Sequence, residues 1–343
     1  MNIQLPLHID STMIACARSC LQKFKLEFCY GFRPPGISID LHAGACFSSA
    51  LEETRKQVWQ HNKSLGTALI KAQARFFQEW GDVEAPEWKK TAKNKDRVWE
   101  AVESYFAQYS PLTDHIQPFM TSEGKPTLEY TFAIPLEPTF DPNKLDPEDG
   151  YNRESGHFGI PDGVFPLHPS GSPFVYCGRF DMLGLYQDRP IVLDDKTTGS
   201  SIGRLWASQW DLRSQFLGYK WACQQCGIPV EEVAVRGVAI QQTQIVHAEA
   251  IKQYSNELIG RWYEQLRRDL WKIRKAWDED YFDFNFADAC TAYGQCTFLN
   301  TCASSNPQNW VTEFEVRHWN PLSRNPAETP EASQEKQDAL DPA

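Results

Sequence analysis

Acidic residues inside two apolar strands are the feature that most constrains this chain. Residues 176–197 predict a β-hairpin, because two apolar runs flank a turn at 187–190. Asp181 lies in the first run and Asp194 in the second. An unpaired carboxylate costs several kcal/mol in a buried strand, so these strand positions require a cationic partner or a metal ion.

The expected pairing of the hairpin brings charged side chains to one face of the sheet. With the turn centred on residues 188–189, Asp181 lies opposite Lys196. Residues two apart on a strand share a face, so Asp181, Asp194 and Lys196 should converge while Asp195 points away. A slip of one residue in the register would break this arrangement.

Two carboxylates and one ammonium group in a cluster are typical of a divalent-metal hydrolase. The acids supply the hard oxygen ligands that Mg²⁺ or Mn²⁺ prefers. The metal polarises a phosphoryl oxygen and lowers the pKa of a bound water molecule. The lysine stabilises developing charge or orients the nucleophile.

Composition bounds the classes of protein that this chain can belong to. Its 343 residues, 41% of them apolar, are enough for one large domain or two average ones. We expect no membrane span and no secretion signal, so the ten cysteines indicate a reducing, cytoplasmic setting. The net charge of −11 argues against a non-specific nucleic-acid coat, although it allows a local basic groove. Residues 321–343 are acidic and proline-rich and are predicted to be a disordered tail.

The order of the predicted elements favours an α/β fold, with a mixed central sheet flanked by helices and a helical lobe at about 44–110. Residues 1–320 are expected to form the domain that carries this sheet. Helices are expected at 8–30, from about Gly44, and at 66–81, 90–110, 208–226 and 248–278; strands are expected at 127–134 and 233–241 besides the hairpin; and a long loop is expected at 135–175.

Three cysteines in a short irregular segment predict a second site. Cys290, Cys296 and Cys302 are separated by equal steps of six, which fits a zinc knuckle poorly. Cys20 is the best fourth donor, with Cys16 as its rival, and four thiolates can hold a [4Fe–4S] cluster. Zinc and ordinary buried thiols are the alternatives. Such a cluster would link the first predicted helix to the last segment. Closing so long a loop would lower the conformational entropy of the unfolded chain.

At these motifs the chain resembles PD-(D/E)XK nucleases of the RecB-like branch that carries an iron–sulfur cluster. That branch includes the AddB nuclease domain and CRISPR-associated single-strand exonucleases. Asp181 matches the first acidic motif, residues 194–196 match (D/E)xK, and Gln215 with Tyr219 matches QxxxY. The one-plus-three cysteine pattern matches as well, and the resemblance spans roughly residues 8–305.

The resemblance implies a restriction-endonuclease-like fold and a role for each motif. Asp181, Asp194 and the backbone carbonyl of Asp195 would hold Mg²⁺ or Mn²⁺, and Lys196 would act on the attacking water. Gln215 and Tyr219 would line the active site and contact DNA. Cys20, Cys290, Cys296 and Cys302 would hold the [4Fe–4S] cluster.

One residue departs from the family pattern. Ser48 stands where the family has a metal-binding histidine in GxxxHxxLE, and a hydroxyl is a weaker ligand than imidazole. A water held by Ser48, the nearby Glu52, or His42 could fill that place. Glu129 matches an acidic residue on the strand before the hairpin, or it is a solvated strand carboxylate.

The function expected from these features is metal-dependent hydrolysis of DNA. We expect an exonuclease on single strands or DNA ends, in recombination, repair or phage DNA processing, in a bacterial or phage-encoded protein with a helicase or recombination partner. Trp206 and Trp210 are candidates for base stacking or for the core. The alternative is a DNA-binding or assembly module of the same fold with a weakened site.

Overall fold

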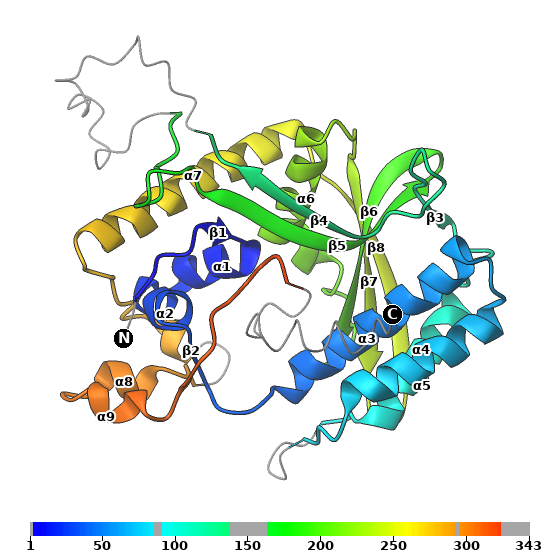
Figure 1. The fold of residues 1–343 in the computed structure, drawn as a ribbon, viewed down its shortest axis with the longest axis horizontal. Helices are drawn as coiled ribbons and strands as arrows, with labels where there is room; N and C mark the ends of the chain where they lie inside the picture. The colour runs from blue at the N-terminus through cyan, green and yellow to red at the C-terminus, as the bar shows by residue number, and fades with distance from the viewer. Residues whose placement is uncertain (1–2, 86–90, 138–162, 292–294, 324–343) are drawn as a thin grey trace, which may run out of the picture. The chain divides into compact units, whose positions relative to one another are not determined.

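The computed structural model describes residues 3–85, 91–137, 163–291 and 295–323 (Figure 1). Most of the predicted 135–175 loop and nearly all of the predicted acidic tail lie outside these residues. None of the helices in the described part combines the length and apolar character needed to span a bilayer.

The chain forms two compact units, which are described separately. The first contains Met1–Pro35, Phe132–Gly178 and Gly260–Ala343, and the second contains Gly36–Thr131 and Arg179–Ile259. Three of the four boundaries fall inside β4 (Leu128–Pro135), β5 (Val175–Tyr186) and α7 (Asn256–Asp278).

The second unit is built on a mixed sheet. Its strands are β3 (Ile116–Pro118), parts of β4 and β5, β6 (Arg189–Thr198), β7 (Glu232–Ile240) and β8 (Ile245–Gln253). The order is β5-β6-β7-β8, and β3 and β4 also pair with β5. β6 and β7 run parallel, whereas β5 with β6 and β7 with β8 are antiparallel. The predicted α/β class with a mixed central sheet is confirmed.

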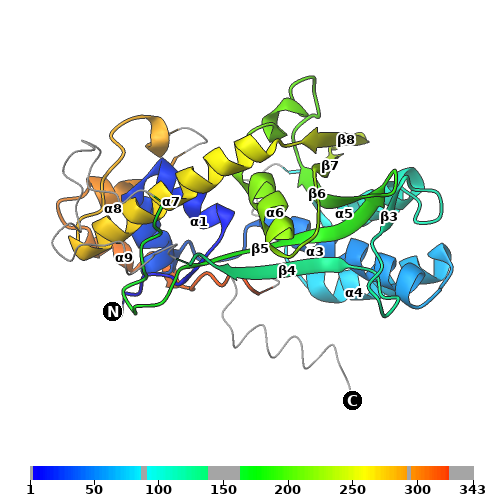
Figure 2. The same ribbon diagram turned by 90° about the horizontal axis from the view of Figure 1, so that it is seen from above.

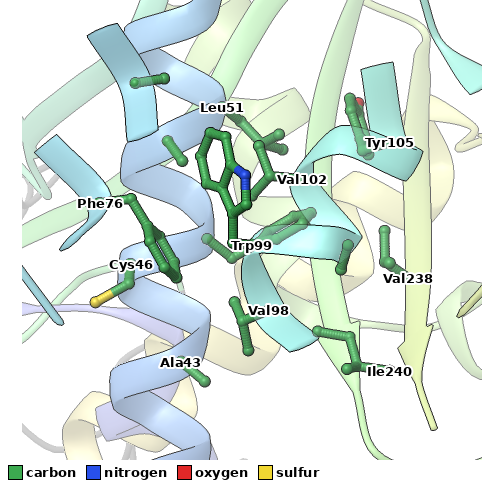
Figure 3. Close-up of a cluster of buried hydrophobic side chains, with 14 of the residues drawn as sticks. Ala43, Cys46, Leu51, Phe76, Val98, Trp99, Val102, Tyr105, Val238 and Ile240 are labelled. Atoms are coloured by element: carbon green, nitrogen blue, oxygen red, sulfur yellow. The ribbon is translucent and has the colours of Figure 1, made fainter. Parts of the chain in front are cut away.

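Three helices form a core of the unit on one face of this sheet; two of them contact the strands, and the third packs against those two helices. They are α3 (Ile39–Arg55), which continues as a π-helical turn at Lys56–Gln60, α4 (Leu65–Trp80) and α5 (Lys95–Gln108). Figure 3 shows Leu51, Phe76 and Trp99 packing between these helices, next to Val238 and Ile240 of β7. The helical lobe is therefore present, but its first helix begins at Ile39 rather than near Gly44.

The helix α6 (Ser214–Gln225) lies on the opposite face of the sheet from α3 and α5 (Figure 2). The predicted helix at 208–226 is wrong over its first residues. Ser208–Trp210 form a separate 3₁₀ turn, and Arg213 has extended backbone angles that interrupt the helix. The predicted helix at 248–278 is wrong at its start, because residues 245–253 pair with β7 as strand β8.

The hairpin of β5 and β6 has a different turn from the predicted one. Gln187 and Asp188 are its two central residues, with φ of 50° and 62°, and Tyr186 pairs with Arg189. A two-residue hairpin loop favours positive φ at both central positions. Asp188 tolerates this conformation well, so the turn is centred one residue earlier than we expected.

The first unit contains the segments at both ends of the chain. Its helices are α1 (Ser11–Ser19), α2 (Leu21–Phe24) with a π-helical turn at Lys25–Cys29, most of α7, a 3₁₀ turn at Asp288–Cys290, α8 (Leu299–Ala303) and α9 (Gln308–Val311). β1 (His8–Ile9) pairs with the start of β5, and β2 (Phe32–Arg33) pairs with β9 (Glu315–Val316). Asp10 caps α1, with its carboxylate accepting from the Met13 amide at 2.8 Å.

The predicted single helix over residues 8–30 is split. Cys20 has φ of −167° and ψ of 119°, which is extended backbone between α1 and α2. Leu26, Phe32 and Phe298 form a small core that includes the half-buried Cys296 and Cys302. This core joins residues near the start of the chain to the cysteine-rich segment.

Candidate active site

Two carboxylates and an ammonium group meet on the α6 face of the sheet. The hairpin register, continued by one pair beyond Met182 and Leu193, puts Asp181 opposite Asp194 rather than opposite Lys196. Asp194 is 2% exposed, and its Oδ2 lies 2.5 Å from Lys196 Nζ. Asp181 lies close enough for its charge to act on Asp194 and Lys196. The expected grouping survives the change of register, because the register differs by two residues and side chains repeat their face every two.

Asp181 is held by the neighbouring strand through a backbone group. The Asp195 amide donates to Asp181 Oδ2 at 2.6 Å. The Asp195 carboxylate lies on the other face of the sheet, as expected. A role for the Asp195 carbonyl as a metal ligand stays a prediction.

Helix α6 adds two polar side chains to the same face. Gln215 and Tyr219 are one turn apart, and Gln215 Nε2 donates to the Tyr219 hydroxyl at 2.6 Å and to Asp194 Oδ1 at 3.4 Å. The Tyr219 hydroxyl donates to the Arg179 carbonyl at 2.6 Å. The helix is thereby fixed to both strands that carry the acids.

Burial and mutual repulsion raise the pKa of the acids. Burial raises the pKa of Asp181 well above its ordinary range, and the charges of Asp194 and Glu129 raise it further. Burial also raises the pKa of Asp194, although Lys196 opposes this. For Lys196, burial lowers the pKa, but Asp194 and Asp181 outweigh it and raise the pKa overall. The two carboxyl groups therefore ionise less readily than free acids do, and Lys196 stays positively charged.

Glu129 of β4 belongs to this electrostatic cluster. Its carboxylate is 3.1 Å from the Arg179 guanidinium, and its own charge acts on Asp181. Burial, followed by the charge of Glu52, raises the pKa of Glu129 to about 7. The structure therefore favours membership of the acidic cluster over a solvated strand position for Glu129.

The α3 residues named as possible ligands are engaged in different ways. Glu52 is buried and pairs with Lys56 at 2.5 Å and with Arg75 at 3.6 Å, and it reaches the cluster through its charge on Glu129. Ser48 is half-buried, and its hydroxyl forms no hydrogen bond with a side chain of the described residues. His42 Nε2 lies 3.1 Å from the Trp80 carbonyl oxygen. No contact joins Ser48 or His42 to the acids in the described part of the chain.

The donor set suits a divalent cation by charge but is not arranged around one point. In the described residues, no group of three or more histidine, cysteine or acidic side chains is placed to hold a metal ion. Asp181, Asp194 and Glu129 nonetheless all have raised pKa values because of burial and repulsion. A bound cation would relieve that repulsion, so these residues fit a metal that draws the carboxylates together.

A buried ionic network, which the sequence pattern did not predict, supports the Asp195 side of the strand. Asp195 Oδ2 lies 2.8 Å from Arg55 Nη2, and its Oδ1 accepts from the Tyr105 hydroxyl at 2.7 Å. Arg236 donates to Tyr105 at 3.2 Å and to both oxygens of Asp114 at 2.6 and 2.7 Å. The Arg236 side chain is only 1% exposed. An arginine inside the apolar run of β7 was the signal in the sequence that a buried partner exists.

The pKa of Glu129 gives a prediction for stability in the absence of metal. Its folded-state pKa of about 7 lies above its ordinary value of 4.5, so the folded state is favoured by protonation of this residue below pH 4.5 and loses that contribution as the pH rises toward 7. The free energy of unfolding in urea with EDTA should therefore fall from pH 5 to pH 8. Glu129→Gln should lose less stability over this range than the wild type. Equal pH slopes for the two proteins would contradict the assignment.

Four cysteines of the first unit line one cavity. Cys20, Cys290, Cys296 and Cys302 surround it, together with Phe298 and other side chains. Burial raises the pKa of the Cys302 thiol to about 11, and the charges of Cys20, Cys296 and Cys290 add to this. The rival Cys16 is instead buried near Glu27, with 3.8 Å between Sγ and Oε2. The predicted four cysteines are thus brought together, while their ligand role stays a prediction.

Comparisons with known proteins add little to this geometry. No family model matches the chain, and no curated protein matches it. The chain is similar to a solved structure described as a "putative exonuclease" from Eubacterium rectale, with 8% identity, a TM-score of 0.43, and coverage of 87% of this chain and 93% of that one. It is also similar to the structure of SSO0001, with 13% identity, a TM-score of 0.27 and coverage of 76% of each chain. Similarity at this level does not identify an activity.

Proposed function

We propose that this protein is a metal-dependent nuclease that hydrolyses DNA, acting as an exonuclease on single strands or DNA ends. The observation that carries the proposal is the meeting of Asp181 and Asp194 on one face of the hairpin, with Lys196 2.5 Å from Asp194. A cation shared by buried carboxylates would relieve the repulsion between them and would keep both ionised. The resemblance of the motifs to PD-(D/E)XK nucleases supports the same function.

The metal in this proposal is Mg²⁺ or Mn²⁺. Asp181 and Asp194, with the Asp195 carbonyl, would hold it through oxygen ligands. When bound, the cation would neutralise the carboxylates and polarise a phosphoryl oxygen. Glu129 is a candidate for an additional ligand, because its charge already acts on Asp181.

The remaining side chains position the reaction. Lys196 holds a proton close to the acids and places its positive charge where negative charge develops on the phosphate. Gln215 keeps Asp194 oriented through its amide, and Tyr219 fixes that amide in turn. Substrate contact by Gln215 or Tyr219 would require one of these hydrogen bonds to be exchanged for one to the phosphate backbone.

The direct test is incubation of the purified protein with end-labelled single- and double-stranded DNA and Mn²⁺. Shortening of the labelled strands that EDTA stops would support the proposal, and intact DNA would refute it. A labelled RNA strand in the same assay would test the choice of nucleic acid.

The second candidate is a DNA-binding or assembly module with the same fold. Ser48 in the place of a histidine favours this second candidate, because a serine supplies no imidazole ligand for the metal. Binding of DNA without cleavage in Mn²⁺ would support this candidate. A helicase or recombination protein would then be the partner to seek.

We also propose a [4Fe–4S] cluster at Cys20, Cys290, Cys296 and Cys302. The four thiols line one cavity, and the equal steps of six between Cys290, Cys296 and Cys302 fit a zinc knuckle poorly. Four thiolates are the ligand set of a [4Fe–4S] cluster, which would join the Cys20 segment to residues 290–302.

Anaerobically purified protein is expected to be brown and to lose its visible absorbance in Cys296→Ser. The reason is that one thiolate ligand is removed from the cluster. Cys226→Ser is the matched control, because Cys226 is exposed and does not line the cavity. A colourless wild-type protein with bound zinc would overturn the assignment.

A further inference from the structure

The segment between β6 and α6 connects two parts of the proposed active site. Residues 199–213, called the 199–213 loop below, follow Lys196 after three positions and precede Gln215 by one residue. Gln215 contacts Asp194 directly. The loop also lies beside Lys196 in space, because its Trp206 ring covers Gly237, the residue that pairs with Lys196 in the β6–β7 register.

The middle of the loop is fixed to the sheet by two tryptophans. The Trp206 ring covers Gly237 of β7 so closely that a Cβ at that position would lie 2.3 Å from its Cζ2. Trp210 is 7% exposed, and its ring centre lies 5.6 Å from that of Trp206. The Tyr254 hydroxyl donates to the Trp210 carbonyl at 2.6 Å. Trp210 thus belongs to the core, whereas the use of the half-buried Trp206 for base stacking stays a prediction.

The parts of the loop next to these anchors carry exposed apolar side chains. Leu205 is 77% exposed and Leu212 is 74% exposed. A single exposed leucine is ordinary on a protein surface. Two on one anchored loop beside a buried polar site present apolar surface to whatever binds there.

The same loop carries uncompensated positive charge. Arg204 and Arg213 are both exposed, and neither forms an ion pair with a described residue. Asp211 is the one acidic residue of the loop, and it is neutralised by Lys252 at 2.6 Å. Two arginines next to two leucines therefore remain available for a partner that is anionic and also apolar.

We propose that the 199–213 loop binds single-stranded DNA next to the acids, and this inference rests on the proposed nuclease function. Arg204 and Arg213 pair with phosphates, while Leu205 and Leu212 contact bases that are not stacked in a duplex. The bases of an intact duplex are stacked and paired, so they offer little surface to the leucines. The loop thereby selects single strands or frayed ends.

The first test is binding of a fluorescein-labelled (dT)20 strand in EDTA, measured by fluorescence anisotropy at several salt concentrations. Arg204→Gln/Arg213→Gln should bind about tenfold more weakly. The slope of log K against log salt should become shallower by about 1.4, since each lost phosphate contact on a single strand changes it by about 0.7. Lys71→Gln, which removes an exposed charge on α4, is the control and should match the wild type.

The leucines are tested with single-stranded and blunt double-stranded DNA. Leu205→Ala/Leu212→Ala should weaken (dT)20 binding several-fold and leave binding of the blunt duplex unchanged. Leu112→Ala, 77% exposed in the same unit, is the matched control. Loop variants that bind (dT)20 as tightly as the wild type does would overturn the proposal. Loop variants that differ from the wild type only in self-association, measured by sedimentation, would overturn it as well.

A small substrate separates this inference from the proposed function. Thymidine 5′-(4-nitrophenyl phosphate) has a phosphodiester but no neighbouring nucleotides, so both double loop variants should hydrolyse it in Mn²⁺ at the wild-type rate. If the wild type cleaves neither this compound nor DNA but binds (dT)20 through the loop, the nuclease function fails and the inference stands. If DNA is cleaved equally by the wild type and the loop variants, the inference fails and the nuclease function stands.

Discussion

Replacing Asp194 with alanine is expected to lower Mn²⁺-dependent DNA cleavage on the order of 10³-fold or more, without unfolding the protein. The substitution removes one of two carboxylates proposed to share the cation and leaves Lys196 without its partner at 2.5 Å. Initial rates on end-labelled single strands, together with circular dichroism, measure the two parts of this expectation. Lys196→Ala should lose about 10²–10⁴-fold in rate, the range typical of a positioned proton-transfer group.

The control for these variants lies on the same hairpin. Asp188→Asn replaces an acid at the turn, where φ is 62° and asparagine is equally tolerated. It should keep the wild-type rate. Full activity in Asp194→Ala would refute the assignment of the site, whereas equal losses in Asp194→Ala and Asp188→Asn would point to a general effect of charge.

Replacing Arg55 with alanine is expected to cost about 3–5 kcal/mol of folding free energy, because it leaves the buried Asp195 carboxylate unpaired. The side chains of Arg55 and Asp195 are only 4% and 1% exposed. Although burial lowers the pKa of Arg55, Asp195 and Tyr105 outweigh it and raise the pKa overall. Urea unfolding at pH 7 measures the loss.

A double-mutant cycle separates the pair from the effects of its two members. Arg55→Ala/Asp195→Ala should be less destabilised than the sum of the single variants, because no buried charge remains unpaired. Arg204→Ala removes an exposed arginine and should change stability by less than about 0.5 kcal/mol. If Arg55→Ala unfolds at the same urea concentration as Arg204→Ala, the network has no structural role.

The acid cluster could be predicted from the sequence because its geometry is local. Asp194 and Lys196 share a face through a spacing of two, and Gln215 and Tyr219 share one through a spacing of four. The error in the turn centre did not affect the predicted cluster, because it changed the expected partner of Asp181 from Lys196 to Asp194, which lies on the same face. A change of one would have moved Asp181 to the opposite face.

The supporting network could not be predicted in the same way. Arg236 meets Asp114 across 122 positions in the chain, and no periodicity connects residues so far apart. Residues 248–253 were misassigned for a related reason, because a short stretch of mixed polar and apolar residues fits a helix or a strand until its pairing with β7 is known. Cys20, named over Cys16 as the fourth donor, lines the cavity with the other three cysteines, and its role as a ligand stays a prediction. The break in the helix at that residue was not foreseen.

The division of the chain into interleaved segments has a consequence for biosynthesis. The second unit is complete once residue 259 has been made, but the first unit also needs residues 260–343. During translation the early segment with Cys20 therefore lacks its packing partners and stays exposed to chaperones and proteases until residues 260–343 are made. The sheet with the acids can already fold before that point. We therefore expect the second unit, with the proposed catalytic residues, to fold before the first unit, with the four cysteines.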